Sequence, residues 1–537
     1  MSRRHPVVLA ILLLSLLVAP AASGAAPPDA DVGVDGAPFT GTDAQGRVRG
    51  YIDAHSHPMA YEAFGGRLMC GKPWDPDGPA AALRDCPDHE PNGVPAWYEN
   101  FTRRGTPFGT HDTRGWPTFK DWPAYDSRTH QQTYYRWLER SWRAGQRVLV
   151  NDLVANRVLC DLYPLKKNSC DEMDTIRLEA RRTRELQDYI DRQNGGPGRG
   201  WFRIVRGPAE ARAVIKQGKL AVVLGIEASE PFGCKQVLGK PQCTAADIDR
   251  GLDEVRRLGV SSMFLCHKFD NALCGIRFDE GITGVLVNTG NAISSGRFWQ
   301  ADTCTGPQHD STLSPVNDAL AGPLRFLRPA GITLPVYPKA PHCNVNGLTA
   351  LGEHMVRGMI KRGMIVEVDH MSVKAAGRTL DLLEQAHYSG VISSHSWMDA
   401  AYARRVYRLG GMVAPYASTA ASFTEGWKAA KAQRDGRYLF GYGYGLDANG
   451  MGALPGRREG SAVRYPFTSP FDKKVTVRQL RTGERNWDLN TDGVAHYGLV
   501  PDWLKDATDI GGPALTEDLS LGAEAYLQMW QRASGVR

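Results

Sequence analysis

Tyr51-Ile-Asp-Ala-His-Ser-His-Pro58 is the stretch around which the rest of the chain is organised. A short apolar start leads into alternating polar residues, and a proline ends the run. Alternate side chains of a β-strand point to the same face, so Asp53, His55 and His57 would converge on one point. Imidazoles and carboxylates gather in this way around a cation. A single His-x-His also occurs by chance on surface strands, so this interpretation depends on partners elsewhere in the chain.

The same form, an apolar run that ends in a polar group, recurs along the chain. Seven further candidate strands follow, at 147–152, 219–227, 261–267, 363–370, 390–395, 411–416 and 439–447. Helical patterns separate most of them, at 133–144, 174–193, 245–258, 349–362 and 373–386. Repeated β-α units give a parallel sheet, and eight of them give a closed barrel. The sequence therefore predicts an α/β fold, a (β/α)₈ barrel of the TIM type.

Three long insertions interrupt this alternation, at 59–130, 268–348 and 448–490. The first is full of Pro, Gly, Trp and Asp, and we expect an inserted lobe that closes over the mouth of the site. The other two are expected on the rim beside it. Residues 516–533 have the pattern of a closing helix with Trp530 on its apolar side. Together, 51–537 are predicted to form one barrel domain with insertions.

The start of the chain has the pattern of an export signal. A basic Arg3-Arg4-His5, an apolar run over 7–18 and small residues over 19–26 indicate a secretory signal peptide at 1–25. The apolar run is shorter than the ~20 residues of a membrane span. No lipid-anchor signal is recognised at either end. We therefore expect a secreted protein without a membrane anchor, with a disordered lead-in over 26–50 that is rich in Ala, Pro, Gly and Asp.

The charge balance excludes one class of partner. A formal net charge of +6 is small for 537 residues. The chain has no Lys/Arg block and no stripe of alternating aromatic and basic residues. Nucleic-acid binding is therefore not expected, and a small-molecule substrate is.

Ten cysteines lie beyond the predicted signal peptide. An even number in an exported protein is typical of disulfides. They fall into neighbours along the chain, which suggests the pairs 70–86, 160–170, 234–243, 266–274 and 304–343, although sequence alone does not determine connectivity. A zinc site built from cysteines is the alternative, but no Cys-x-x-Cys pair is present to form one.

Six polar side chains at the predicted strand ends form one candidate site: His55, His57, Glu227, His370, His395 and Asp447. Each alone has an ordinary structural role, as a buried histidine, an ion-paired carboxylate or a turn former. Glu227, however, ends a strongly apolar strand, where an unpaired carboxylate is costly. A carboxylate that bridges two divalent ions satisfies that demand. Taken in barrel order, the set predicts a metal centre.

At this point the chain resembles the membrane (renal) dipeptidase family of zinc peptidases. The motifs that carry the resemblance are Asp53-Ala-His-Ser-His57, Gly225-Ile-Glu227, Phe264-Leu-Cys-His267-Lys-Phe-Asp-Asn271, Gly363-Met-Ile-Val-Glu-Val-Asp-His-Met-Ser372, Val391-Ile-Ser-Ser-His-Ser396 and Gly445-Leu-Asp-Ala-Asn-Gly450. They stand in the order of the family's own motifs and run, with the insertions, from about 51 to 535.

The resemblance implies a role for each matched residue. Two zinc ions are expected: His55 and His57 bind one, His370 and His395 bind the other, and Glu227 bridges them. His267 is implied to be a substrate-site group that contacts the scissile carbonyl or its oxyanion. Asp447 is implied to be the acid/base that handles the water and the leaving amine. Arg404 or Arg405 is implied to hold the substrate carboxylate by a bidentate contact.

The chain departs from the family at one ligand position. His57 stands where the family has a carboxylate, and His-x-His is usual in the wider amidohydrolase superfamily. The substitution removes one negative charge from the site. The sequence therefore predicts an exported metal-dependent hydrolase of a dipeptide or similar small amide, with a lactone, phosphoester or cyclic amide hydrolase as the alternative. A secreted binding protein on a degenerate barrel is the candidate from another class.

Overall fold

The computed structural model describes residues 30–37, 41–104, 106–111, 113, 123–313, 335–460, 463–483 and 485–535. The predicted signal peptide at 1–25 lies outside these residues. None of the described helices is long and apolar enough to cross a membrane.

Two parallel four-stranded sheets form the centre of the α/β fold. The first has the order β2 (Tyr51–Ser56), β3 (Gln146–Ala155), β5 (Leu220–Ala228) and β4 (Phe202–Val205). The second has the order β13 (Met412–Val413), β12 (Val391–Ser393), β11 (Ile365–Glu367) and β8 (Ser262–Met263). All residues of β3 and β5 are buried, as expected for a parallel sheet covered on both faces.

Single parallel bridges connect the edges of the two sheets. Leu224 of β5 pairs with Val260 before β8, and on the other side Asp53 of β2 pairs with Tyr444. Tyr416, which follows β13, pairs with Gly445. The predicted strand at 439–447 is therefore reduced to isolated bridges, and β4 is a strand that the sequence pattern did not predict.

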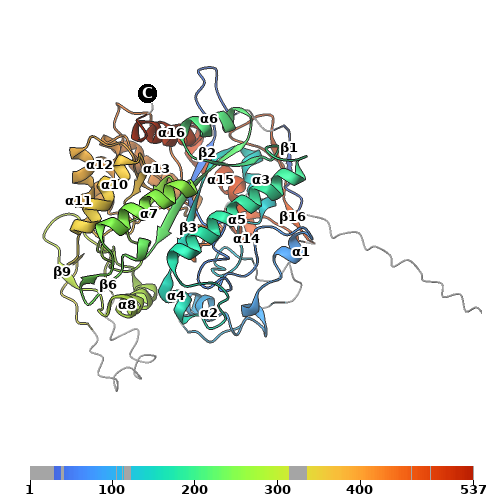
Figure 1. Cartoon of the computed structure of the whole chain (residues 1–537). Helices are drawn as coiled ribbons and strands as arrows, with labels where there is room; N and C mark the ends of the chain where they lie inside the picture. Colours follow the sequence, from blue (N-terminus) through green and yellow to red (C-terminus); the bar gives the residue numbers. More distant parts are fainter. Residues whose placement is uncertain are drawn as a thin grey trace, which may run out of the picture.

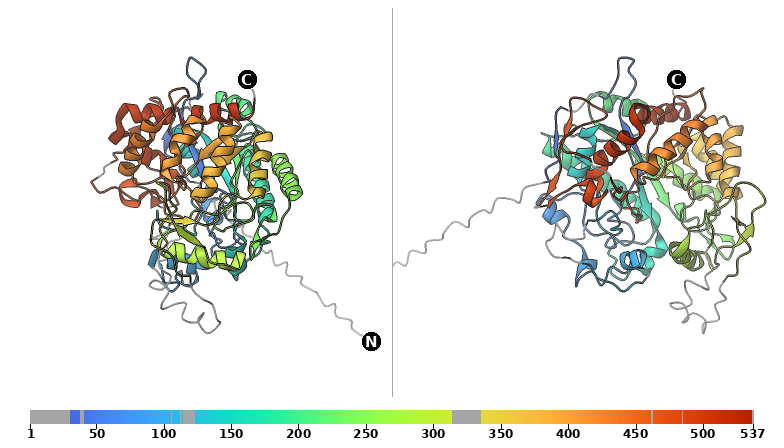
Figure 2. Two further views of the ribbon diagram at one scale, coloured as in Figure 1. Left: turned by 90° about the vertical axis from the view of Figure 1, so that its left-hand side faces the viewer. Right: turned by 180° about the vertical axis from the view of Figure 1, so that it is seen from behind.

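Helices lie outside the strands in both views of Figure 2. The five helices predicted from periodicity are present within one or two residues: α3 (Tyr135–Ala144), α5 (Glu172–Gln193), α7 (Ala245–Leu258), α10 (Ala350–Lys361) and α11 (Val373–Gln385). The other α-helices are α1 (Pro79–Ala82), α2 (Trp97–Arg104), α4 (Arg157–Leu162), α6 (Pro208–Lys216), α8 (Gly281–Ser295), α12 (Ala403–Arg408), α13 (Ala420–Gln433), α14 (Leu489–Asp492), α15 (Val500–Ser520) and α16 (Gly522–Ala533).

The short elements belong mostly to the insertions. The remaining strands are β1 (Val34–Asp35), β6 (Gln236–Val237), β7 (Lys240–Pro241), β9 (Ala301–Thr303), β10 (His342–Asn344), β14 (Phe467–Thr468), β15 (Thr476–Val477), β16 (Arg481–Thr482) and β17 (Arg485–Asn486). The 3₁₀ helices are η1 (Pro87–His89), η2 (Pro231–Gly233), η4 (Ala400–Tyr402) and η5 (Tyr497–Leu499).

Local sequence determines where the surrounding helices begin and end. Thr244 caps α7 in a capping box with Asp247, and Gly259 in the left-handed conformation ends the helix. The closing helix predicted over 516–533 is instead two helices, because α15 runs to Ser520 and α16 starts at Gly522. A Cβ at Gly522 would stand 2.3 Å from the carbonyl oxygen of Tyr442, so only glycine allows this close approach.

The two ends of the molecule differ. Figure 1 shows α6 and α16 at one end and α2, α4 and α8 at the other, with β3 running between them. At the first end, Tyr526 and Trp530 of α16 join the apolar cluster that includes Ile52, Val148 and Ile365 of three strands. The strands point their carboxyl ends toward the second end, so polar groups that follow them gather there.

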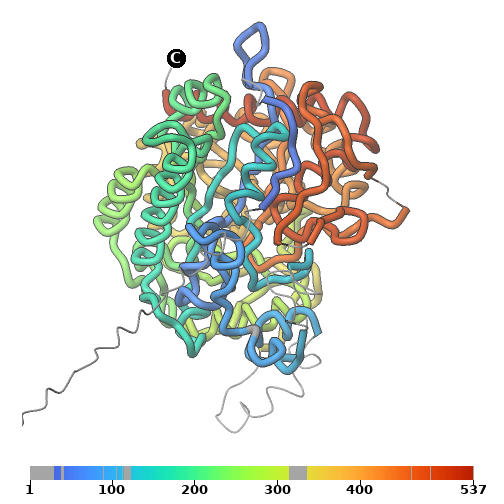
Figure 3. The backbone as a smooth tube through the Cα atoms, turned by 90° about the vertical axis from the view of Figure 1, so that its right-hand side faces the viewer, coloured from blue at the N-terminus to red at the C-terminus, as the bar shows by residue number. Residues whose placement is uncertain are grey.

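Two of the insertions lie at this second end, as expected. Phe64, Tyr98 and Arg128 of the first insertion line the same cavity as Glu227 and His370. In the second insertion, α8 also lines this cavity. Figure 3 shows the blue segment of the first insertion and the yellow-green segment of the second at the same end of the molecule.

The third insertion was wrongly placed on the rim as a whole. Gly450, Met451 and Gly452 line the cavity. Phe471, however, packs on Tyr51 with ring centroids 4.9 Å apart. Tyr51 starts β2, so this part of the insertion covers the opposite end of the sheet.

The described part of the lead-in, 30–37 and 41–50, is ordered and not disordered as predicted. β1 pairs with β15, with Val34 opposite Val477. Val34 and Val48 are buried, and the amide of Val48 donates to Glu524 of α16 at 2.8 Å. The composition of this segment gave no sign of these long-range partners.

All five suggested disulfides are present: Cys70–Cys86, Cys160–Cys170, Cys234–Cys243, Cys266–Cys274 and Cys304–Cys343. Pairing of nearest neighbours along the chain was therefore the right prediction. Cys266–Cys274 brackets His267, and Cys304–Cys343 closes part of the second insertion, so the bridges stiffen the loops around the site.

Candidate metal centre

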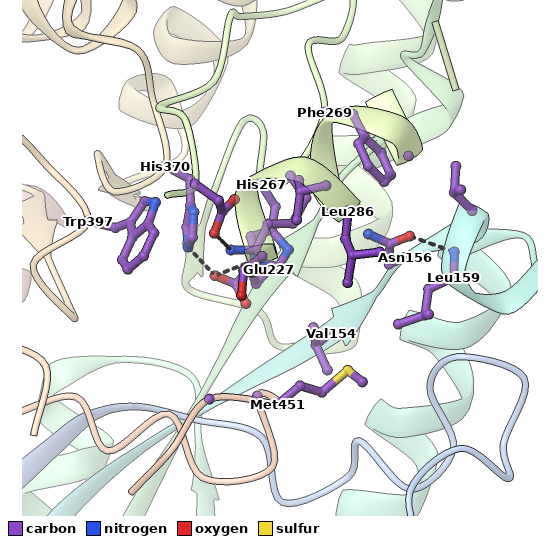
Figure 4. Close-up of a pocket in the computed structure, with 18 of the residues that line it drawn as sticks. Val154, Asn156, Leu159, Glu227, His267, Phe269, Leu286, His370, Trp397 and Met451 are labelled. Atoms are coloured by element: carbon purple, nitrogen blue, oxygen red, sulfur yellow. Dashed lines mark hydrogen bonds and ion pairs between the residues drawn. The ribbon is translucent and has the colours of Figure 1, made fainter. Parts of the chain in front are cut away.

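The ends of the parallel strands bring the predicted polar side chains to one point. The carboxylate of Glu227, on β5, lies at the centre. Nε2 of His370 lies 3.2 Å from Glu227 Oε1, and Nε2 of His57 lies 3.4 Å from Oε2. His55 and His395 approach Oε1 at 3.7 and 4.0 Å. Figure 4 shows His370 and His267 turned toward this carboxylate.

Two groups of ligand atoms have the geometry to hold a metal ion. His55, His57 and Glu227 form one group, and Glu227, His267 and His370 form the other, with all ligand atoms of a group within 4.8 Å of one another. The second group includes His267 where the sequence predicted His395. His395 still faces the same point, because its Nε2 lies 2.8 Å from Nε2 of His370.

Hydrogen bonds on the far side of the rings determine which nitrogens face the centre. Nδ1 of His57 lies 2.7 Å from the carbonyl oxygen of Asp152, which can only accept, so Nδ1 carries the proton. Nδ1 of His55 lies 3.0 Å from Asp152 Oδ2, and Nδ1 of His395 lies 3.0 Å from Asp369 Oδ2. In each neutral ring, the lone pair then sits on Nε2 and points at Glu227.

The donor set fits a divalent cation. Nε2 of His55 and Nε2 of His57 are 3.0 Å apart, an arrangement in which two lone pairs repel unless a cation lies between them. Nitrogens that share a tetrahedral zinc at ~2.0–2.1 Å stand about 3.3 Å apart. Oε1 of Glu227 is buried and accepts no hydrogen bond from the described residues. Imidazoles oriented by carboxylates on their far side are typical of metal ligands.

The electrostatics of the second group favour neutral rings. Burial and the charge of Lys268 hold the pKa of His267 well below its usual value. Burial and the neighbouring His267 and Lys268 do the same for His370. Burial alone would lower the pKa of His55, but the carboxylates of Glu227 and Asp152 raise it well above the usual value. Protons and metal ions therefore compete for the His55 side of the site.

Asp447 lies at the mouth of the centre, in the Gly445–Gly450 turn. Its Oδ1 is 3.1 Å from Nε2 of His57 and 3.6 Å from Nε2 of His55. Burial would raise its pKa, but these imidazoles hold it well below the usual value, so the carboxylate stays ionised. Gly450 leaves room for the carboxylate in this position, because a Cβ there would stand 1.7 Å from Asp447 Oδ1.

A cavity of about 650 Å³ opens onto the centre. Glu227, His267, His370, His395 and Asp447 lie on its wall. The opposite side is apolar, and Figure 4 shows Leu159, Leu286 and Phe269 on that side of Glu227, away from Trp397.

The two arginines predicted to hold a substrate carboxylate are not at the cavity. Arg405 of α12 pairs with Glu384 and Asp381 of α11, each at 2.7 Å, and Arg404 is exposed on the same short helix. Neither side chain lines the cavity. The structure therefore gives no support to this assignment, since Arg405 is already paired and Arg404 is exposed.

Arg128 is the arginine of the first insertion that does line the cavity. Its Nε is buried, and within the part of the chain that the structure describes Nε has no hydrogen-bond partner and no carboxylate pairs with the guanidinium. Lys268 and Arg277 also line the cavity, but both have partners: Lys268 lies 3.0 Å from Asp279, and Arg277 donates to the carbonyl of His309 at 2.8 Å. Nothing in the sequence pattern distinguished Arg128.

Asp152 and Asp369 are the functional residues that sequence reasoning missed. Each orients a ring that faces Glu227, and each is buried. A signal was present, since Asp152 ends the predicted strand at 147–152 and Asp369 directly precedes His370. Both therefore obey the rule that polar groups at strand ends reach the site.

No protein-family model and no curated protein matches the chain. Among solved structures, it is similar to dipeptidase AC, a metallo peptidase of family M19, with 12% identity, a TM-score of 0.45, and coverage of 91% of this chain and 99% of that chain. It is also similar to a metallo peptidase from Rhodobacter sphaeroides liganded with a phosphinate mimic of the dipeptide L-Ala-D-Ala, at 11% identity and TM-score 0.44, covering 90% and 99% of the two chains. An amidohydrolase from Pseudomonas aeruginosa has 12% identity and TM-score 0.39, covering 73% and 91%.

Proposed function

We propose that this chain is an exported metal-dependent hydrolase that cleaves an amide bond in a dipeptide or similar small amide. The observation that carries the proposal is the convergence of imidazoles from separate strands on the Glu227 carboxylate. The ordered motifs that resemble the membrane dipeptidase family support the same reaction.

We infer two divalent ions, with zinc as the expected metal. His55 and His57 would hold one, His370 and His395 the other, and Glu227 would bridge them. When bound, such ions polarise a carbonyl and lower the pKa of water. The close approach of the two Nε2 atoms in each histidine pair, 3.0 Å for His55 and His57 and 2.8 Å for His370 and His395, supports this assignment.

Asp447 and His267 are proposed to act on the substrate. Asp447 is ionised and faces the centre, so it can accept a proton from water and pass it to the leaving amine. His267 lines the cavity with its Nε2 3.5 Å from Glu227 Oε1. A ring at this position can hydrogen-bond the carbonyl oxygen as negative charge develops on it.

Arg128 is proposed to hold the substrate carboxylate in place of Arg404 and Arg405. The Arg128 guanidinium lies on the cavity wall with a buried Nε that is unpartnered among the described residues, so a bound anion would satisfy it. A carboxylate suits this position because its two oxygens can accept two parallel hydrogen bonds from one guanidinium. Burial and the charge of Asp447 raise the pKa of Tyr416 and the charge of Arg128 lowers it, so Arg128 lies near Tyr416 and Asp447 on the cavity wall.

Two further assignments belong to the proposal. The parallel bridges between the two sheets support a closed eight-stranded barrel in which the predicted strand at 439–447, bridged at Tyr444 and Gly445, is the eighth. The five disulfides support export into an oxidising compartment, as the predicted signal peptide implies.

The test is a metal and activity measurement on the full chain made in a disulfide-permissive host. We expect about two equivalents of metal, hydrolysis of dipeptides, loss of activity on chelation and recovery on adding Zn²⁺. Less than one equivalent of metal together with no hydrolysis would overturn the proposal.

His57 favours a second candidate on the same site. It stands in contact with Glu227 at 3.4 Å, where the resembled family has a carboxylate. Lactones, phosphoesters and cyclic amides should therefore be assayed beside the dipeptides. Turnover of one of these without dipeptide hydrolysis would select this second candidate.

A further inference from the structure

Helix α8 buries a face of mostly small and polar residues, whereas a surface helix ordinarily buries its apolar face. Apart from Val285, the residues that it turns inward are small or polar, among them Gly284, Asn288, Asn291 and Ser294. Its cavity side carries Leu286, Val287 and Ile293, beside Thr283, Thr289 and Gly290. A helix on an apolar core normally shows the reverse pattern, with apolar residues inward and polar residues outward.

Specific hydrogen bonds hold this inverted helix in place. Asn288 accepts from the amide of Trp299 at 2.7 Å, and Asn291 accepts from the amide of Asp270 at 2.8 Å. Ser294 donates to Glu230, which is itself paired with Arg157 of α4 at 2.7 Å. The orientation of α8 is therefore determined by its polar side, and its apolar side is left to the cavity.

Helix α4 completes the same surface. Val158, Leu159 and Leu162 line the cavity beside α8, with which α4 is in contact. We call these three side chains together with Leu286, Val287 and Ile293 the apolar wall. Leu162 is 55% exposed and Ile293 is 52% exposed. Apolar surface that stays in contact with solvent does not stabilise the fold, and such a patch is typical of a binding site.

The apolar wall and the metal centre border the same cavity. Val154 on β3 is the Cα partner of Glu227 on β5, and Asn156 caps the start of α4 by accepting from the amide of Leu159 at 2.9 Å. In Figure 4, Val154 and Leu286 lie between Glu227 and Leu159. A group bound on the wall therefore shares the cavity with a carbonyl held at the centre.

The size of the cavity leads to the same conclusion. About 650 Å³ equals roughly 20 waters at ~30 Å³ each. A dipeptide of two small residues has about 11 non-hydrogen atoms, so even at the ~30 Å³ of a water for each atom it fills no more than about half of the cavity. The remaining space borders the apolar wall.

We propose that the substrate carries a large apolar group on the acyl side of the scissile amide, which binds on the apolar wall while its carboxylate lies at Arg128. This inference rests on the proposed function and narrows its substrate to small amides of amphipathic, N-acyl amino acid type. Burial of apolar surface on α4 and α8 supplies the selectivity.

The test uses ligands that cannot be hydrolysed. 4-Oxoundecanoic acid is the ketomethylene analogue of N-octanoylglycine, and 4-oxopentanoic acid is that of N-acetylglycine. Binding to the full chain is measured by calorimetry with and without added Zn²⁺. We expect the longer ketone to bind at least about thirtyfold more tightly, because its extra methylenes become buried.

Variants on and off the apolar wall test whether the tighter binding of the longer ketone comes from the wall. Leu286→Gln with Ile293→Gln should reduce binding of the longer ketone about tenfold and leave the shorter one unchanged. Ile282→Gln is the control, since Ile282 is 44% exposed on the same helix but does not line the cavity. Circular dichroism of each variant checks folding.

The outcomes separate this inference from the proposed function. Equal affinity for the two ketones, or an equal loss in the Ile282→Gln control, overturns the inference. Tighter binding of the longer ketone, together with less than one equivalent of bound metal and no hydrolysis of dipeptides or of N-octanoylglycine, keeps the apolar wall and overturns the hydrolase. Hydrolysis of N-acetylglycine and N-octanoylglycine with the same kcat/KM keeps the hydrolase and overturns the wall.

Discussion

The metal centre and the apolar wall face each other across one cavity, yet they are held in place in opposite ways. The centre is built from side chains that follow parallel strands, with carboxylates such as Asp152 and Asp369 orienting the rings from behind. The wall is built from α4 and α8, two helices in the segments that connect the strands. Hydrogen bonds of the polar residues on the side of α8 that faces away from the cavity hold this helix in place.

This difference separates the part of the molecule that performs the chemistry from the part that selects the substrate. Strand ends are rigid and converge, so they suit chemistry that needs atoms placed within tenths of an ångström. Connecting helices vary in length and orientation without disturbing the strands, so they suit recognition of the rest of a substrate. Changes at the centre should affect every substrate equally, and changes at the wall should depend on the substrate.

Replacing Glu227 should have the largest effect. Glu227→Ala removes the carboxylate at which both ligand groups meet, so hydrolysis should fall by at least about 1,000-fold for all substrates. Bound metal, measured by elemental analysis, should fall below that of the wild type. Full activity with full metal would show that Glu227 does not bridge the site.

Replacing Asp447 should come next. Asp447→Asn keeps the shape but cannot accept a proton, so kcat should fall about 100- to 1,000-fold while metal content and KM stay near wild type. Asp435→Asn serves as the control, because Asp435 pairs with the exposed Arg437. Unchanged turnover in Asp447→Asn would remove Asp447 from the chemistry.

The carboxylates behind the rings should have a smaller effect. Asp152→Asn and Asp369→Asn should each weaken metal affinity about 10- to 100-fold, since the rings lose an acceptor that orients them. Competition with a chelator measures this affinity, and Asp161→Asn on the exposed side of α4 is the control. Unaltered affinity in both variants would limit the two carboxylates to a role in folding.

Arg128 should have the smallest effect of these on the reaction. Arg128→Ala should raise KM about 10- to 100-fold for substrates with a free carboxylate and leave their amidated counterparts unchanged. Arg404→Ala, on the outward-facing helix, should change neither. If Arg404→Ala raised KM and Arg128→Ala did not, the carboxylate would bind elsewhere than the structure indicates.

Much of the site was predictable because its residues obey a local rule. An apolar run that ends in a polar residue is visible in the sequence at Glu227 and His370, and disulfides between neighbours such as Cys266 and Cys274 follow from spacing. The ordered lead-in was not predictable, since β1 depends on β15 far along the chain. Arg128 was missed for the same reason, because its importance lies in the absence of a partner among the described residues.

The sequence alone indicated the α/β alternation, suggested the disulfide pairs and pointed to most of the side chains that meet at the candidate metal centre, because each depends on short-range periodicity or spacing. Only the tertiary structure decided that Arg404 and Arg405 face outward, that Arg128 faces inward, and that α8 turns its apolar side to the cavity. These features depend on which elements pack together, and long-range packing leaves no local pattern in the chain.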